Sequence, residues 1–230
     1  MSEYDDKNMD WQTQDSATPA LIEHWRNLRS HAHSSDSRLV TVSDFGKGTD
    51  SVSAEINPYP DILVQATVVL FGDRSAEGQV IAGIAVPWFE IVSQLERDPD
   101  FLFTIPWRKL EEIIAGAYQR DGWPEVVLTP RSGDRGRDVI ATRPGVGSIR
   151  IVDQIKAYRR GHVVTADEVR SMLGVLSAEQ NVSKGLITTT SLFAPGIEKD
   201  SGLSAFMPYR LELKDGEQLR RWLQELATSR

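Results

Sequence analysis

The sequence predicts an α/β fold for the C-terminal part of the chain and a smaller α+β region before it. In residues 101–230 a helical pattern is followed by several strands, a helix, a strand, a short helix, a strand and a final helix, which is typical of α/β proteins. Before residue 100, two β-branched runs lie between helical patterns. The 230 residues are 40% hydrophobic, which suits one good core and a smaller appended unit.

The first hundred residues divide into two predicted stretches. Residues 1–16 have few apolar anchors and are expected to be disordered, whereas 17–100 form the N-terminal α+β region. There a helix is predicted over 19–29, and the β-branched runs 62–71 and 79–86 form a hairpin across GDRSAEG. Pro87 opens a further helix, and the segment RDPD at 97–100 ends it, so we place the domain boundary there.

The elements after residue 100 follow from periodicity and from local stop and start signals. Apolar residues repeat at helical intervals over 110–118, and Gly122 stands where a helix would end. Thr165 and Glu168 are spaced as a capping box for a further helix. Strands are predicted over 125–129, 137–142, 148–156, 185–190 and 206–213, and the final helix over 217–227.

Composition excludes several classes of site. The chain has no cysteine, so it has no disulfide, thiolate nucleophile or zinc finger, and any metal must be bound by oxygen or imidazole. The acidic start MSEYDDKNMDWQTQDS does not resemble a signal peptide, and no apolar run approaches the roughly 18 residues of a membrane helix. We therefore expect a soluble, cytoplasmic protein without a membrane partner.

The charge is unevenly distributed. The net charge of −7 is unusual for a protein that binds nucleic acid, because lysine and arginine supply most of that affinity. Residues 106–161, however, contain eleven basic and seven acidic side chains, a net +4, which leaves −11 on the rest of the chain. This polarity favours one basic surface, although charges scattered over a globule would give the same totals.

A small set of polar residues around the strand 148–156 is suited to metal-dependent chemistry. Side chains alternate along a strand, so Gln154 and Lys156 project from the same face. Asp138 begins the preceding strand, and the short connection between the two strands predicts an antiparallel pair. The pairing brings a carboxylate, an amide and an ammonium into one small volume, although in isolation such residues are common on half-exposed strands.

Hydrolysis of a phosphodiester bond needs such a set. A hard cation such as Mg²⁺ prefers oxygen ligands, and one or two carboxylates with the substrate phosphate suffice to hold it. Asp138 is the natural direct ligand, Gln154 offers an amide oxygen, and Lys156 can orient water or stabilise a developing oxyanion. On the preceding helix, Glu111 lies at the edge of the apolar face, whereas Glu112 turns toward solvent.

Four sequence blocks then carry a resemblance to a known family: LEEIIAGAYQRDGW, SGDRGRDVIA, IVDQIKAY and GLITTTSLFAP. In this order and spacing they resemble the catalytic domain of Mrr-like restriction endonucleases, a branch of the PD-(D/E)XK superfamily, over residues 106 to about 200. In that family a helix glutamate, an aspartate after a G-D-x-G-x-D turn and a Q-x-K strand form the site. These fall on Glu111, Asp138, Gln154 and Lys156.

The resemblance implies a central mixed sheet flanked by helices, DNA as the substrate and Mg²⁺ as the cofactor, with Mn²⁺ able to substitute. It also implies an endonuclease of a bacterial restriction or antiviral defence system, in which the N-terminal region serves recognition, a partner protein or homo-oligomerisation. Five arginines bracket the site and could contact DNA phosphates: Arg131, Arg135, Arg137, Arg159 and Arg160. Two alternatives stay open: a catalytically silent nucleic-acid-binding or scaffolding subunit, and a nuclease that is dormant until a partner activates it.

Overall fold

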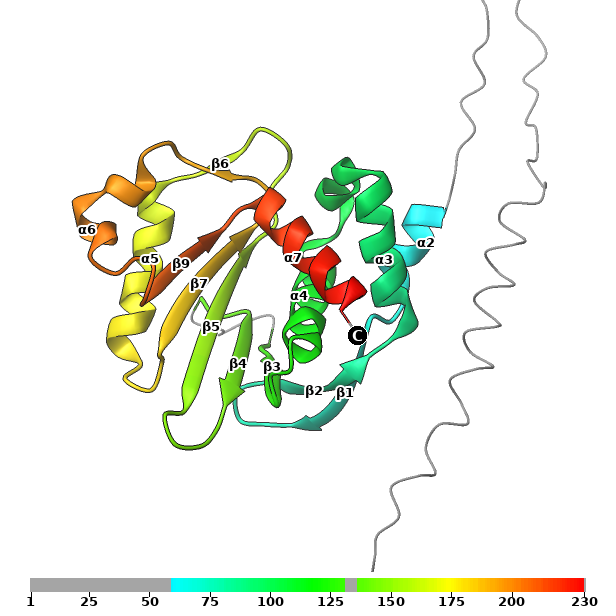
Figure 1. The fold of residues 1–230 in the computed structure, drawn as a ribbon, viewed down its shortest axis with the longest axis horizontal. Helices are drawn as coiled ribbons and strands as arrows, with labels where there is room; N and C mark the ends of the chain where they lie inside the picture. Colours follow the sequence, from blue (N-terminus) through cyan, green and yellow to red (C-terminus); the bar gives the residue numbers. More distant parts are fainter. Residues whose placement is uncertain (1–58, 131–135, 230) are drawn as a thin grey trace, which may run out of the picture. The chain divides into compact units, whose positions relative to one another are not determined.

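A mixed seven-stranded sheet organises the protein. The computed structural model describes residues 59–130 and 136–229, so the disorder expected for 1–16 and the helix expected over 19–29 lie outside the described residues. The strand order is β1-β2-β3-β4-β5-β7-β9. This sheet and the helices on its two faces (Figure 1) confirm the α/β fold class.

The first five strands of the sheet are antiparallel to their neighbours, and the last two run parallel to β5. Short connections join the pairs β1–β2, β3–β4 and β4–β5. Residues 85–124, which include three helical segments, separate β2 from β3, and the parallel pair β5–β7 needs the helical crossover between its strands. The strands are β1 (Val69–Arg74), β2 (Gln79–Ile84), β3 (Glu125–Leu128), β4 (Val139–Arg143), β5 (Ile149–Lys156), β7 (Lys184–Thr189) and β9 (Leu211–Lys214). A small parallel pair, β6 (Val163–Val164) with β8 (Leu192–Phe193), forms a separate sheet.

Helices cover both faces of the sheet. On one face α5 packs against Val152, Ile140 and their neighbours in an apolar cluster, with α6 beside it, whereas α3, α4 and α7 lie on the other side (Figure 1). The helices are α2 (Tyr59–Gln65), α3 (Val86–Arg97), α4 (Trp107–Arg120), α5 (Ala166–Ala178), α6 (Ser201–Ser204) and α7 (Gly216–Thr228), with 3₁₀ turns η1 (Pro99–Thr104) and η2 (Ile197–Lys199).

The start of α5 confirms the capping box predicted from sequence. The Thr165 side chain accepts a hydrogen bond from Glu168 N, and the Glu168 carboxylate accepts one from Thr165 N. Two otherwise unpaired backbone donors of the first turn are thereby satisfied. This cap also fixes the position of the Glu168 carboxylate, which matters for the site described below.

Two strand predictions were wrong in part. Residues 59–65 form α2 and the strand begins at Val69, because Pro60 and Asp61 suit the first turn of a helix. The alternating run 206–213 contributes only its end, β9. Before it the chain turns, with Arg210 N and Leu211 N both bonded to Phe206 O, and Pro208 has no N–H for a sheet ladder.

The domain boundary predicted at 97–100 does not divide the observed fold. β2 pairs with β3 through Gln79↔Leu128 and Val80↔Val127, so the sheet continues across that position. Residues 60–230 form one compact unit. The segment RDPD does end a helix, but the hairpin before that helix completes the sheet of the C-terminal part.

Within the described residues, no helix combines the length and apolar character that a membrane crossing requires.

Candidate active site

Asp138 lies immediately before β4, where its carboxylate is fixed to the neighbouring strand. Its backbone N donates to Asp153 O at 2.9 Å, which extends the β4–β5 ladder by one residue. Its Oδ2 accepts a 2.6 Å hydrogen bond from Ile155 N. The carboxylate is therefore held beside the segment of β5 that carries the two other predicted site residues.

Gln154 faces α5 and the turn that precedes Asp138. A side chain at Gly136 would lie 3.2 Å from Gln154 Nε2 and 3.7 Å from Val175 Cγ2. Gly136 also has a φ of +76°, which glycine adopts without strain, so the turn both needs glycine and packs closely on the amide. Gln154 Oε1 is buried and has no hydrogen-bond partner in the described part of the chain. A buried carbonyl oxygen of this kind has a lone pair available to a bound ion or water.

Lys156 ends β5 on the same face, and its ammonium lies near a carboxylate of α5. Its Nζ is 3.8 Å from Glu168 Oε1, and the Tyr158 hydroxyl donates to that same oxygen at 2.5 Å. Burial alone would raise the pKa of Glu168, but hydrogen bonds from Thr165 and Tyr158 and the charge of Lys156 lower it to about 2. Burial and the Glu168 contact raise the pKa of Tyr158 to about 12.

Glu111 lies on α4 and is buried, as its place on the apolar face predicted. Arg108 Nη1 donates to Glu111 Oε2 at 2.7 Å and to Thr129 O at 3.0 Å. Thr129 follows β3, and its backbone N donates to Asp138 O at 3.0 Å. Glu112, in contrast to the prediction, is half-buried and pairs with Lys109.

These bonds link two of the four predicted residues, Glu111 and Asp138, to the end of β5 that carries the other two. From Glu111 a chain of contacts runs through Arg108 and Thr129 to Asp138, and from Asp138 to the end of β5. There Gln154 and Lys156 alternate with Ile155, so both project from the face that α5 covers. The start of β4 and the end of β5 thus carry Asp138, Gln154 and Lys156, and Glu111 on α4 is linked to Asp138 through Arg108 and Thr129. These four residues are called the cluster below.

Asp153, next to Gln154, belongs to a different network on the opposite face. It is fully buried, and its Oδ2 accepts hydrogen bonds from Tyr118 OH at 3.0 Å and Thr188 Oγ1 at 2.9 Å. Burial raises the pKa of Asp153 to about 6, although Lys214, Thr188 and Tyr118 act in the other direction. Burial lowers the pKa of Lys214 in turn. Asp153 therefore ties the sheet to α4 rather than joining the cluster.

The cluster suits a hard divalent cation in its chemistry. The described residues include no group of three or more histidine, aspartate or glutamate side chains able to hold a metal. The Asp138 carboxylate and the Gln154 amide oxygen, with the Glu111 carboxylate, would form a smaller protein ligand set, which Mg²⁺ accepts because it keeps several waters. The unpartnered Gln154 Oε1 favours such a ligand role, so the residues present fit the ion.

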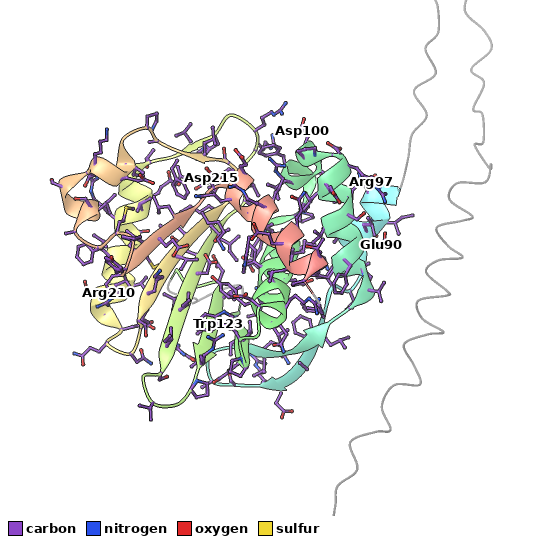
Figure 2. The ribbon with its side chains drawn as sticks, viewed as in Figure 1. Glu90, Arg97, Asp100, Trp123, Arg210 and Asp215 are labelled. Carbon is purple, nitrogen blue, oxygen red and sulfur yellow. The ribbon has the colours of Figure 1, made fainter. Side chains whose placement is uncertain are left out.

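The arginines predicted to contact phosphate differ in their surroundings. Arg131 and Arg135 lie outside the described residues. Arg137 Nη1 lies 2.8 Å from Glu179 Oε1 and 3.5 Å from Glu77 Oε1, so two carboxylates already balance its charge. Arg159 is exposed, and exposed Arg160 bonds to Asp100, just beyond the end of α3 (Figure 2).

Three residues at the cluster were not foreseen from the sequence. Glu168 was predicted only as half of a capping box, and Arg108 and Tyr158 were not assigned to the site. The i, i+3 spacing of Arg108 and Glu111 is the one available signal, since that spacing places two side chains together on a helix. Nothing local indicates that α5 returns Glu168 to the end of β5.

Comparison with known proteins gives one family match and one curated relative of low identity. The profile of the restriction endonuclease family Mrr_cat matches residues 102–223, just over half of the chain. An uncharacterized protein, y4cE, of Sinorhizobium fredii (strain NBRC 101917 / NGR234) is 28% identical over 126 residues, which are 54% of this chain and 31% of that protein. The chain thus corresponds to about a third of that relative's length.

Two solved structures align with part of the chain at low identity. The MspJI restriction endonuclease in complex with a 27-mer oligonucleotide aligns with 62% of this chain and 31% of its own, at 15% identity and a TM-score of 0.37. The DNA modification-dependent restriction endonuclease AspBHI aligns with 62% and 36% of the two chains, at 18% identity and a TM-score of 0.36. On the family match over residues 102–223, the chain belongs to the Mrr-type restriction endonuclease family.

Proposed function

We propose that the chain is a metal-dependent DNA endonuclease that hydrolyses phosphodiester bonds in a bacterial defence system. The observation that carries this proposal is the cluster at the end of β5, where the Asp138 carboxylate is fixed to Ile155 N beside Gln154 and Lys156. Membership of the restriction endonuclease family supports DNA as the substrate. The proposed cytoplasmic location agrees with a DNA target.

Each residue of the cluster has a separate task. Asp138 and Gln154, with Glu111 directly or through water, would hold a divalent cation. When bound, Mg²⁺ or Mn²⁺ would lower the pKa of a water molecule and offset charge on the phosphate. The Lys156 ammonium would orient the attacking water or stabilise the charge that develops on a phosphate oxygen. The contacts that Asp138 makes with the β5 backbone keep it in place before substrate binds.

DNA binding would rely on basic side chains around this end of the sheet. Arg159 and Arg160 are exposed and can reach a phosphate backbone without breaking a buried ion pair. Arg137 would first have to leave Glu179 and Glu77. Residues 1–58 are proposed to serve target recognition, a partner protein or homo-oligomerisation, since cutting both strands favours two copies of the site.

The test is cleavage of plasmid DNA, with and without cytosine methylation, in Mg²⁺ and in EDTA. Wild type is expected to cut only with the metal, and Lys156→Ala to cut about 100-fold more slowly or worse, because a charge-stabilising donor is lost. Lys199→Ala is the matched control, since this exposed lysine of η2 lies outside the cluster. It should cut like wild type.

Other outcomes favour the alternatives. A silent nucleic-acid-binding subunit predicts no metal-dependent cleavage by either protein and little change in DNA affinity on Lys156→Ala. A dormant nuclease predicts cleavage by wild type only after a partner is added, and still none by Lys156→Ala. Equal cleavage by wild type and Lys156→Ala would show that the cluster is not the active site.

A further inference from the structure

The Glu168 carboxylate makes contacts that its helix-capping role does not need. The cap uses Oε2, which accepts from Thr165 N at 2.8 Å and from Thr165 Oγ1 at 3.0 Å. The second oxygen, Oε1, faces away from the cap, toward Tyr158 OH at 2.5 Å and Lys156 Nζ at 3.8 Å. One carboxylate thus joins the start of α5 to the end of β5.

The chain around Lys156 is held firmly at its backbone. Lys156 O accepts from Thr189 Oγ1 at 2.9 Å and from Thr190 N at 3.2 Å. Two residues later, Tyr158 N donates to Thr190 Oγ1 at 2.8 Å, and that hydroxyl donates to Tyr158 O at 2.7 Å. The Tyr158 ring therefore starts from a fixed backbone when it donates to Glu168.

The Lys156 side chain, by contrast, has four rotatable bonds and would otherwise sample many positions. Its side chain is 15% exposed and that of Glu168 26%, so the pair is largely shielded from solvent and from screening by salt. A carboxylate anchored by three hydrogen bonds offers the ammonium a preferred position at the edge of the cluster. Ordering a reacting group before substrate binds lowers the barrier that remains.

We propose that Glu168, itself held by Tyr158 and Thr165, is a positioning residue that keeps the Lys156 ammonium in place for phosphodiester hydrolysis. The inference rests on the proposed nuclease function. It adds Glu168 to the four residues that the sequence predicted for the active site. Glu168 touches Lys156 and acts through it, so its loss should reduce turnover and leave DNA binding intact.

The test measures kcat and KM for DNA cleavage in Glu168→Gln. The amide keeps an oxygen that can accept from Thr165 N, so the cap survives while the charge facing Lys156 is lost. We expect kcat to fall by about 10- to 100-fold, as for other groups that orient a reacting side chain, with KM nearly unchanged. Tyr158→Phe, which removes one donor to Oε1, should give a smaller fall in kcat.

Asp215→Ala is the matched control for a purely structural role. The Asp215 side chain caps α7 by accepting from Gln218 N at 2.8 Å and takes no part in the contacts of Glu168, so the melting temperature should fall while kcat below melting stays near that of wild type. A loss of kcat in Asp215→Ala as large as in Glu168→Gln would overturn the inference, because loss of helix stability alone would then explain it.

A second readout is independent of turnover. In a double-mutant cycle with Lys156→Gln and Glu168→Gln, the effects on unfolding should be non-additive, since the two side chains are in contact. Additive effects would overturn the inference. If wild type cuts and Glu168→Gln cuts equally well, only the positioning role fails. If wild type cuts no DNA with any divalent metal, the proposed function fails and the inference fails with it.

Discussion

At the residue scale, Asp153 is a buried carboxyl group whose ionisation should lower the free energy of unfolding. Its folded pKa of about 6 lies above the ordinary value of 3.8, chiefly because of burial. The folded protein therefore binds this proton more tightly than the unfolded chain. The stabilisation is complete below the ordinary pKa and is lost as pH rises through about 6, where the buried carboxyl must ionise.

Asp153→Asn isolates this contribution. Tyr118 and Thr188 both donate to Oδ2, whereas Oδ1 has no partner among the described residues, so an asparagine can keep both hydrogen bonds through its oxygen. When the pH is raised from 4 to 7, the free energy of unfolding of wild type should fall by on the order of 2–3 kcal/mol more than that of Asp153→Asn, which has no carboxyl group to ionise at this position. Urea denaturation at several pH values measures the difference, and parallel curves for the two proteins would contradict it.

Residues of the site differed in how far the sequence could predict them. Alternation along one strand predicted that Gln154 and Lys156 share a face, and helical spacing predicted that Glu111 is buried. Glu168 could not be assigned in this way, because its contact with Lys156 depends on how the chain returns after β6. Contacts made across such crossovers leave no periodic signal in the sequence.

At the scale of elements, α4 packs through a glycine against α3 and β1. A Cβ on Gly116 would lie 2.9 Å from two atoms of the fully buried Trp88 ring and 3.1 Å from Val69 Cγ1. The ring cannot move freely, because Trp88 Nε1 donates to Ile113 O at 2.9 Å. The close approach of the two helices therefore depends on the missing side chain.

Gly116→Ala should destabilise the protein by about 1–3 kcal/mol, as overpacking of a core does. Gly174→Ala is the matched control, since a Cβ at this exposed position of α5 meets no atom within 4 Å. There the alanine should stabilise by about 0.5–1 kcal/mol through its better helix propensity. Chemical denaturation of both variants checks the opposite signs, and equal effects would argue against the packing account.

Elements with strong local signals were predicted well, and those set by tertiary context were not. The N-terminal capping box of α5 and the helical periodicity of α4 are local features, and both helices are observed where expected. The run 62–71 mixes apolar residues that suit either a helix or a strand, and its first part is helical. Because this run is short, the spacing of its apolar residues does not distinguish a helix from a strand.

At the scale of the whole molecule, residues 59–99 complete the sheet and core of the nuclease fold. β2 covers the edge of β3, and α2 and α3 bury side chains that are fully shielded from solvent, among them Leu63, Ile91 and Leu95. The family profile begins only at residue 102, so sequence similarity places the start of the domain later than the fold does.

A fragment of residues 101–230 should therefore fail to fold cooperatively, whereas 59–230 should unfold in one transition. The shorter fragment loses seven buried aliphatic side chains worth about 1.5–3 kcal/mol each, which together are comparable with the 5–15 kcal/mol that stabilises a typical domain. They are Leu63, Val68, Val69, Ile81, Ile91, Val92 and Leu95. The shorter fragment also exposes the unpaired edge of β3, which invites aggregation. Thermal unfolding followed by circular dichroism distinguishes the fragments, and a sharp transition in 101–230 would show that the hairpin and α3 are dispensable additions to a self-sufficient core.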